Sequence, residues 1–177
     1  QRLTLPRRLA ELPEQIDARG LHLGSPCQAG DARELVVVDR HHHAVALGLE
    51  EAGVRYALLN LKHHHRSDVM TQILGARAVI LGSSTMNNGL LPRMAGFLSY
   101  MRGLKPTGKL GAAFGSFGWS GEAVKLLTTT LTEMKIDVIE EGLRMKYVPT
   151  AAQLEECREM GKRIGLAVLN SADKEDR

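Results

Sequence analysis

Short apolar runs alternate with helical patterns along most of this chain, and that alternation restricts its fold more than any other feature. Four runs, rich in Val, Ile, Leu or Ala, are too short for helices; they cover 35–38, 56–59, 78–81 and 110–114. A fifth run covers 137–143, and a helical pattern follows each of the five runs. Continuously apolar strands separated by helices are typical of a parallel sheet covered on both faces. The sequence therefore predicts an α/β fold, a three-layer, doubly wound, five-stranded parallel sheet.

Local signals predict where individual helices begin and end. Gly53 is expected to end the first helix, because glycine readily takes the left-handed conformation at a helix terminus. Gly103 and Pro106 are expected to stop the third helix in that order. Ser120 is expected to cap the fourth helix, and the sequence Thr150-Ala-Ala-Gln153 is a capping box that opens the last one.

The chain has 177 residues, a length that fits one domain with a short appendage. Pro and Gly punctuate residues 1–32, so this segment is predicted to be an N-terminal arm or linker with at most a helical turn or two. The domain itself is expected over 33–170, with a C-terminal tail over 171–177. Only 4% of the residues are aromatic, so the core is expected to consist of Leu, Val, Ile, Ala and Met.

Charge and cysteine content exclude several classes of partner and compartment. The net charge is +3, and the basic residues are too scattered to form a nucleic-acid-binding stripe. Cys27 and Cys157 lie far apart and form no CxxC motif, which favours two reduced thiols in the cytoplasm. No apolar run approaches the roughly 18 residues of a membrane span. A cytoplasmic protein without nucleic-acid or membrane binding is expected.

Two glycine-dense loops, 82–89 and 115–122, directly follow the third and fourth apolar runs. In a parallel sheet, ligands bind at loops that leave the carboxyl ends of the strands. Small hydroxyl and amide side chains beside one tryptophan suit a flat aromatic ligand with polar edges, such as a flavin. Trp119 would cover one face of the ring by offset stacking. Two plainer interpretations stay open, an aromatic plug for Trp119 and a simple tight turn for 87–89.

Several segments resemble the flavodoxin-like domain of flavodiiron proteins, in the same order and spacing, over about residues 60–164. They are His65-Arg-Ser-Asp68, Gly82-Ser-Ser-Thr-Met-Asn-Asn-Gly-Leu-Leu-Pro92, Leu104-Lys-Pro106 and Gly111-Ala-Ala-Phe-Gly-Ser-Phe-Gly-Trp-Ser-Gly-Glu-Ala-Val-Lys125. The resemblance implies a flavodoxin-like sheet of strand order 2-1-3-4-5, with FMN at its end. The implied cofactor-binding residues are Ser84, Thr85, Met86, Asn87, Asn88, Gly89, Ser116, Phe117, Gly118, Trp119 and Gly121.

The first loop departs from the pattern of that family, whose FMN phosphate lies in a loop rich in Ser and Thr after the first strand. Here the strand leads into Arg40 and the histidines 41–43, and no Ser or Thr lies between Asp39 and Arg55. Two outcomes stay open. Arg40 and the histidines carry the phosphate near the amino end of a helix, or flavin binding is weakened and the fold survives as a scaffold.

No metal site is expected from the histidine triplets at 41–43 and 63–65. Adjacent side chains point in different directions along a strand or helix, so three consecutive histidines rarely bind one ion. The resemblance also implies diiron ligands in a separate domain, and residues 1–32 carry no such cluster. This chain is therefore not expected to hold a diiron site by itself.

Together these features predict an FMN-binding electron-transfer module without a catalytic residue of its own. Its expected partners are redox proteins, among them a diiron or iron–sulfur protein, and it could form an oligomer or join a larger complex. The alternative is a flavin-free, flavodoxin-fold scaffold or interaction subunit. An FMN-dependent quinone or nitro reductase ranks last, because the sequence offers no specific sign of a nicotinamide site.

Overall fold

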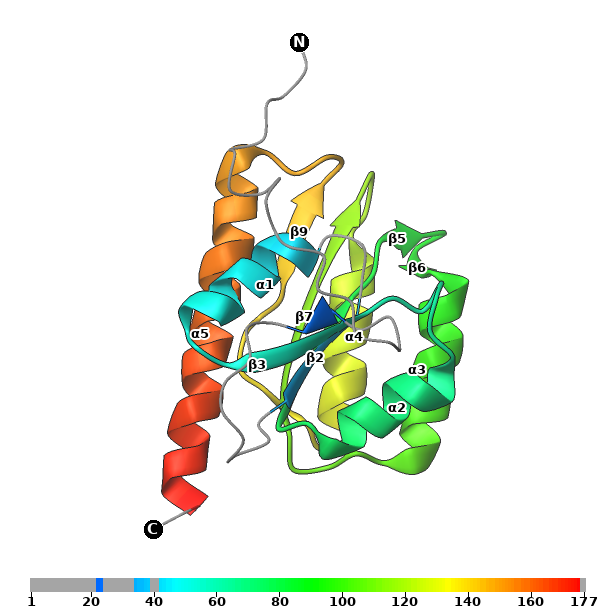
Figure 1. Cartoon of the computed structure of the whole chain (residues 1–177). Helices are drawn as coiled ribbons and strands as arrows, with labels where there is room; N and C mark the ends of the chain where they lie inside the picture. Colours follow the sequence, from blue (N-terminus) through cyan, green and yellow to red (C-terminus); the bar gives the residue numbers. More distant parts are fainter. Residues whose placement is uncertain (1–21, 24–33, 39–41, 176–177) are drawn as a thin grey trace.

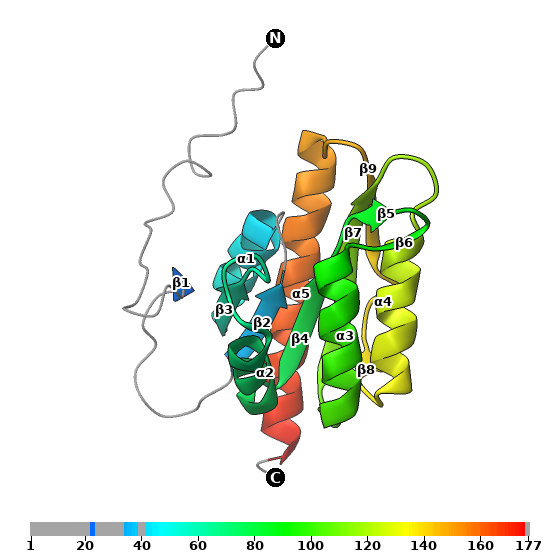
Figure 2. The same cartoon turned by 90° about the vertical axis from the view of Figure 1, so that its right-hand side faces the viewer.

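The computed structural model describes residues 22–23, 34–38 and 42–175. Within these residues, seven strands form one sheet with helices on both faces (Figure 1, Figure 2). The predicted class, an α/β fold built on a parallel sheet, is confirmed. The parallel strands are β2 (Glu34–Val38), β3 (Arg55–Leu59), β4 (Ala78–Gly82), β7 (Leu110–Phe117), β8 (Asp137–Val138) and β9 (Leu143–Lys146).

The strand count differs from the predicted five for two reasons. The order is β1-β3-β2-β4-β7-β8, with β9 also pairing β7. First, β1 (His22–Leu23) lies in the segment expected to be an arm and pairs with β3 antiparallel. Second, the predicted strand 137–143 divides into β8 and β9. The register pairs Gly111 with Val138 and Phe114 with Leu143, so this segment has two more residues than β7 and bulges out between them.

Two hydrophobic cores lie on opposite faces of the sheet. Helices α2 (Arg66–Gly75), α3 (Pro92–Leu104) and α4 (Glu122–Glu133) cover one face, and α1 (His42–Glu51) and α5 (Ala151–Glu175) cover the other. Side chains alternate along β4, so that Val79 and Leu81 enter the first core and Ala78 and Ile80 enter the second.

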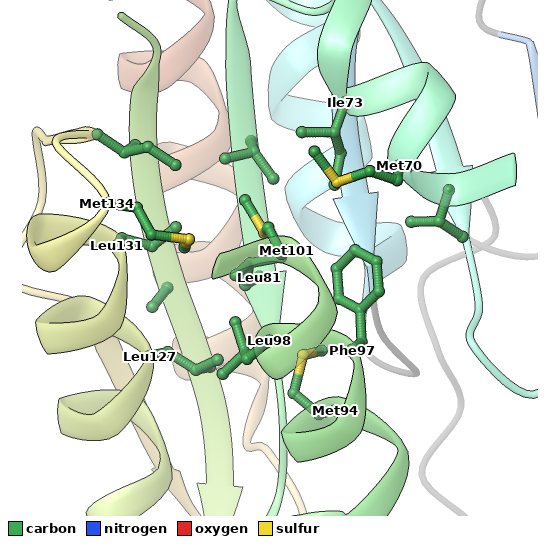
Figure 3. Packing of buried hydrophobic residues seen from close by; sticks show 14 of the residues in the cluster. Met70, Ile73, Leu81, Met94, Phe97, Leu98, Met101, Leu127, Leu131 and Met134 are labelled. Carbon is green, nitrogen blue, oxygen red and sulfur yellow. The ribbon is translucent and has the colours of Figure 1, made fainter. Parts of the chain in front are cut away.

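The core on the side of α2, α3 and α4 is rich in methionine, as the low aromatic content predicts. Its buried side chains include Met70, Met94, Met101, Met134 and Phe97 (Figure 3). Methionine is unbranched and flexible, and it fills irregular gaps between helices. The predicted composition of the core is therefore confirmed, with Phe97 as an aromatic addition.

Helices α1 and α5 approach each other closely on the opposite face. A Cβ at Gly48 would lie 1.9 Å from the Arg158 carbonyl oxygen, and one at Gly161 would lie 2.1 Å from that of Val45. The two backbones are therefore in contact at both glycines. At the same crossing, the Arg158 guanidinium pairs with the Glu51 carboxylate.

Three of the local helix signals can be judged directly. Gly53 has φ +76° after α1, as predicted. The capping box is confirmed, because Thr150 N–H donates to Gln153 Oε1 at 3.0 Å and Gln153 N–H donates to Thr150 Oγ1 at 3.3 Å. The prediction for Gly103 is wrong. It lies inside α3, which ends at Leu104; Lys105 is the C-cap residue, with φ 48° and its amide donating to the Met101 carbonyl.

The last helix is longer than predicted, since α5 continues to Glu175 through most of the segment expected as a tail. Among the described residues, none of the helices combines the length and apolar character that crossing a bilayer requires.

Candidate functional site

Two loops leave the sheet side by side at the carboxyl ends of β4 and β7. These strands are parallel neighbours, and Gly82 pairs with Phe114 in their register. Ser83 N–H donates to the Phe114 carbonyl at 3.1 Å, which extends the pairing by one residue. The loops 83–91 and 118–121 therefore begin at the same edge, which is where ligands bind in open α/β sheets.

The first loop folds into a small hairpin that consists of β5 (Thr85–Met86) and β6 (Gly89–Leu90) (Figure 1). Asn87 and Asn88 connect the strands with φ 48° and 56°. Two consecutive residues with positive φ are typical of a type I′ turn, and asparagine tolerates that conformation. The segment is also a tight turn in its own right, so its role toward a ligand rests on its surroundings.

Hydrogen bonds join the hairpin to the second loop. Ser84 Oγ lies 2.8 Å from Ser116 Oγ, and Ser120 Oγ donates to Asn88 Oδ1 at 3.2 Å. Four polar side chains expected near this edge are thus brought together from loops about thirty residues apart in sequence. The two loops form one connected rim rather than two independent turns.

The amino terminus of α4 completes this connection. Ser120 was predicted as its N-cap, but that prediction is wrong, because Gly121 occupies the cap position with φ +75°. A glycine has no side chain with which to cap a helix. Instead, Thr85 Oγ1 accepts a hydrogen bond from the Ala123 amide at 3.3 Å. A residue of the first loop thus caps the helix that follows the second loop.

Two residues at the base of this rim lie within the predicted loops but were not among the predicted cofactor-binding residues. Ser83 is completely buried, and its hydroxyl donates to the Ser84 carbonyl at 3.0 Å and accepts from the Leu91 amide at 3.3 Å. It thereby joins both ends of the hairpin segment. Gly115 lies against it, since a Cβ there would stand 2.1 Å from the Ser83 carbonyl oxygen. Their positions at the ends of apolar runs were the available signal.

The rim carries an exposed indole. Trp119 is 91% exposed, which contradicts the interpretation of this residue as an aromatic plug. Met86, another predicted contact, is 41% exposed on the hairpin. An indole that contacts so little of its own chain remains available to stack on a flat ligand or a partner.

The other predicted residues of the second loop support its backbone. The Phe117 ring lies within 3.1 Å of the position that a Cβ on Gly121 would take, so it packs inside its own loop. Gly118 faces the Tyr147 ring in the same way, at 3.4 Å. The arrangement fits a flavin, because it offers glycine backbone, hydroxyl and amide groups and an exposed indole at one edge.

The predicted phosphate loop falls largely outside the described residues. Arg40 and His41 are not among them, and His43 is exposed in the first turn of α1. In the second histidine triplet, His65 Nδ1 accepts from the Ser67 amide at 3.3 Å and caps α2, and His64 folds back onto Asn60. In the part of the chain that the structure describes, no three His, Cys, Asp or Glu side chains gather as metal ligands would.

The doubly wound sheet and the two joined loops at its carboxyl edge define a flavodoxin-like protein. A sequence model of the family described as Flavodoxin matches residues 43–161, and the chain belongs to that family. The cofactor of flavodoxins and of their flavodiiron relatives is FMN.

Flavodiiron proteins are among the relatives of this chain. Rubredoxin-oxygen oxidoreductase of Megalodesulfovibrio gigas is 44% identical over 124 residues, which cover 70% of this chain and 31% of that protein. Nitric oxide reductase of Moorella thermoacetica is 40% identical over 129 residues, which cover 72% and 32%. The chain therefore spans about a third of the length of these relatives and matches only their flavodoxin-like part.

Solved structures agree with this assignment. The flavodiiron protein from Giardia intestinalis superposes with a TM-score of 0.76 at 30% identity, over 81% of this chain and 38% of that one. A flavodoxin from the domain Archaea gives a TM-score of 0.68 at 30% identity, over 77% of this chain and 98% of that one. The resemblance to the flavodoxin-like domain of flavodiiron proteins is thereby confirmed.

Proposed function

We propose that this chain is an FMN-binding electron-transfer module that passes electrons between redox partner proteins. The observation that carries the proposal is the connected rim, in which Ser84 meets Ser116 and Asn88 meets Ser120 beside the exposed Trp119. Because these bonds form within the protein itself, the rim is preorganised for a ligand. The family assignment supplies the identity of that ligand.

The residues of the rim would bind the ring and tune it. When bound, FMN supplies the redox chemistry, and the protein contributes orientation and electrostatics. The loops 84–89 and 116–121 would hold the ring through backbone N–H groups, with glycines allowing close approach. Trp119 would cover a face of the ring and keep water from it. None of these side chains is assigned a proton-transfer role.

The phosphate would be held at the amino end of α1, by Arg40 and the histidines 41–43. A helix N-terminus attracts anions through its free N–H groups and its dipole, and α1 has no acidic residue in its first turn to oppose this. Arginine adds a paired hydrogen-bond donor for phosphate oxygens.

The partner is proposed to be an iron protein, with a diiron or an iron–sulfur centre. The names of the relatives support this, because they mention rubredoxin, oxygen and nitric oxide. The matched part makes up only about a third of those proteins, so their remaining parts are proposed to act here as a separate subunit or domain. Assembly into an oligomer or a larger complex would bring that partner to the rim.

The proposal is tested by titrating the protein with FMN and with riboflavin, following flavin fluorescence and absorbance. Saturable binding of FMN that is tighter than binding of riboflavin supports both the ring site and the phosphate site. Equal affinity for the two ligands would mean that the phosphate adds nothing to binding, and the proposed role of Arg40 would then be wrong. If neither ligand binds, the electron-carrier function fails and the flavin-free scaffold takes its place. Stepwise reductive titration of the FMN complex then has to yield reversible reduction.

A further inference from the structure

A third segment contacts the rim that the loops 83–91 and 118–121 form. It is the turn between β9 and α5. Phe117 pairs with Lys146 at the end of the parallel β7–β9 ladder. The next residue, Tyr147, continues the contact, since its N–H donates to the Phe117 carbonyl at 2.8 Å. This bond reaches the last residue of β7, directly before the glycine and tryptophan of the second loop.

Tyr147 adopts an unusual backbone conformation to make this contact. Its φ is +58°, in the left-handed region that residues other than glycine and asparagine rarely enter. Burial does not explain this, because the side chain is 63% exposed and does not belong to either core cluster of the described residues. An outlier of this kind at a ligand loop points to a functional constraint.

The ring of Tyr147 covers Gly118. Its Cε1 atom lies 3.4 Å from the position that a Cβ on Gly118 would occupy, and Lys146 Nζ lies 5.6 Å from the ring centroid. Gly118 offers no side chain of its own to restrict the loop, and Trp119 follows it directly. Tyr147 thus fixes this segment twice, through its amide at Phe117 and through its ring at Gly118.

We propose that Tyr147 is a positioning residue of the flavin site, which restricts the loop that carries Trp119. The restriction is a property of the chain alone, whereas its consequence for FMN rests on the proposed function. A mobile indole must lose its freedom when it stacks on a ligand, and that loss weakens binding. Tyr147 removes part of this freedom in advance.

The first test measures the loop without any ligand. Trp119 is the only tryptophan of the chain, so time-resolved anisotropy of its emission in the FMN-free protein reports on this loop directly. The test variant is Tyr147→Asn, because asparagine tolerates the left-handed backbone and removes the ring. A larger fast component of anisotropy decay is expected in Tyr147→Asn, and wild-type decay in Tyr147→Phe. Identical decay in all three proteins overturns the proposal.

The second test measures FMN affinity in the same proteins. Tyr147→Asn is expected to raise the Kd roughly three- to tenfold, the size of one lost aromatic contact, and Tyr147→Phe is expected to leave it unchanged. Val148→Thr, at a neighbouring side chain that is 78% exposed, serves as a control for a general change in this turn. Its Kd should equal that of the wild type. An unchanged Kd in Tyr147→Asn also overturns the proposal.

The outcomes separate this inference from the proposed function. If the wild-type protein does not bind FMN, the proposed function fails while the anisotropy measurement still decides whether Tyr147 restricts the loop. If the wild type binds FMN and Tyr147→Asn behaves identically in both assays, only the positioning role fails. Thermal unfolding followed by circular dichroism checks that each variant is folded, which the exposure of the Tyr147 ring leads us to expect.

Discussion

Gly115→Ala tests the idea that the two loops depend on close contact between the ends of β4 and β7. A Cβ at this position would lie 2.1 Å from the Ser83 carbonyl oxygen and 3.2 Å from Val124 Cγ2. The oxygen belongs to the backbone, and Ser83 N–H is bonded to Phe114. The new methyl group can therefore be accommodated only if one strand end moves away from the other.

The size of the effect follows from that distance. A nonbonded carbon and oxygen rarely approach within about 3.3 Å, so the two strand ends must separate by roughly 1 Å. Overpacking of this kind typically costs about 1–3 kcal/mol, and we expect a value near the upper end because backbone atoms collide. The same displacement would break the 2.8 Å contact between Ser84 Oγ and Ser116 Oγ. Each 1.4 kcal/mol of binding free energy that is lost in this way raises the FMN Kd about tenfold.

Urea unfolding and FMN titration measure the two consequences of Gly115→Ala separately. The matched control is Gly96→Ala, on the exposed side of α3, where an added Cβ meets no atom within 4 Å. Alanine favours a helix over glycine by about 0.5–1 kcal/mol, so this control should be more stable and bind FMN normally. The reasoning is refuted if Gly115→Ala retains both wild-type stability and wild-type affinity.

Three further predictions concern the indole, the helix crossing and the buried thiol. Trp119→Ala should leave urea unfolding unchanged, because the side chain is 91% exposed, and should raise the FMN Kd roughly tenfold; equal affinity would exclude stacking. Gly161→Ala should lower the free energy of unfolding by about 1–3 kcal/mol, because its Cβ would lie 2.1 Å from the Val45 carbonyl oxygen; an unchanged urea midpoint would contradict the close crossing. Burial, aided by the charge of Glu156, raises the pKa of the Cys157 thiol from 9.0 to about 11. Below pH 9 the thiol keeps its proton in both the folded and the unfolded protein. Between pH 9 and pH 11 only the unfolded protein loses that proton, so the free energy of unfolding of the wild type should fall by roughly 2 kcal/mol more than that of Cys157→Val. Parallel pH curves from urea unfolding would disprove this.

The sequence by itself determined the fold class, because hydrophobic periodicity is a local property that burial imposes on each element. The runs 78–81 and 110–114 became β4 and β7, and the capping box at Thr150 and Gln153 formed as expected. These signals involve residues at most a few positions apart, so no knowledge of the rest of the chain is needed. The glycine-dense loops could also be placed at the carboxyl edge, since parallel strands bring them there.

Tertiary structure alone decided how the site is held together. The cap of α4 comes from Thr85, thirty-eight positions before the amide that it accepts from, and Ser120 bonds to Asn88 instead of capping its own helix. Tyr147 reaches Gly118 only because β9 pairs with β7. In each case a polar group or ring finds its partner across the sheet edge. Strand order and register decide which groups become neighbours in space, and the local sequence around each residue does not contain that information.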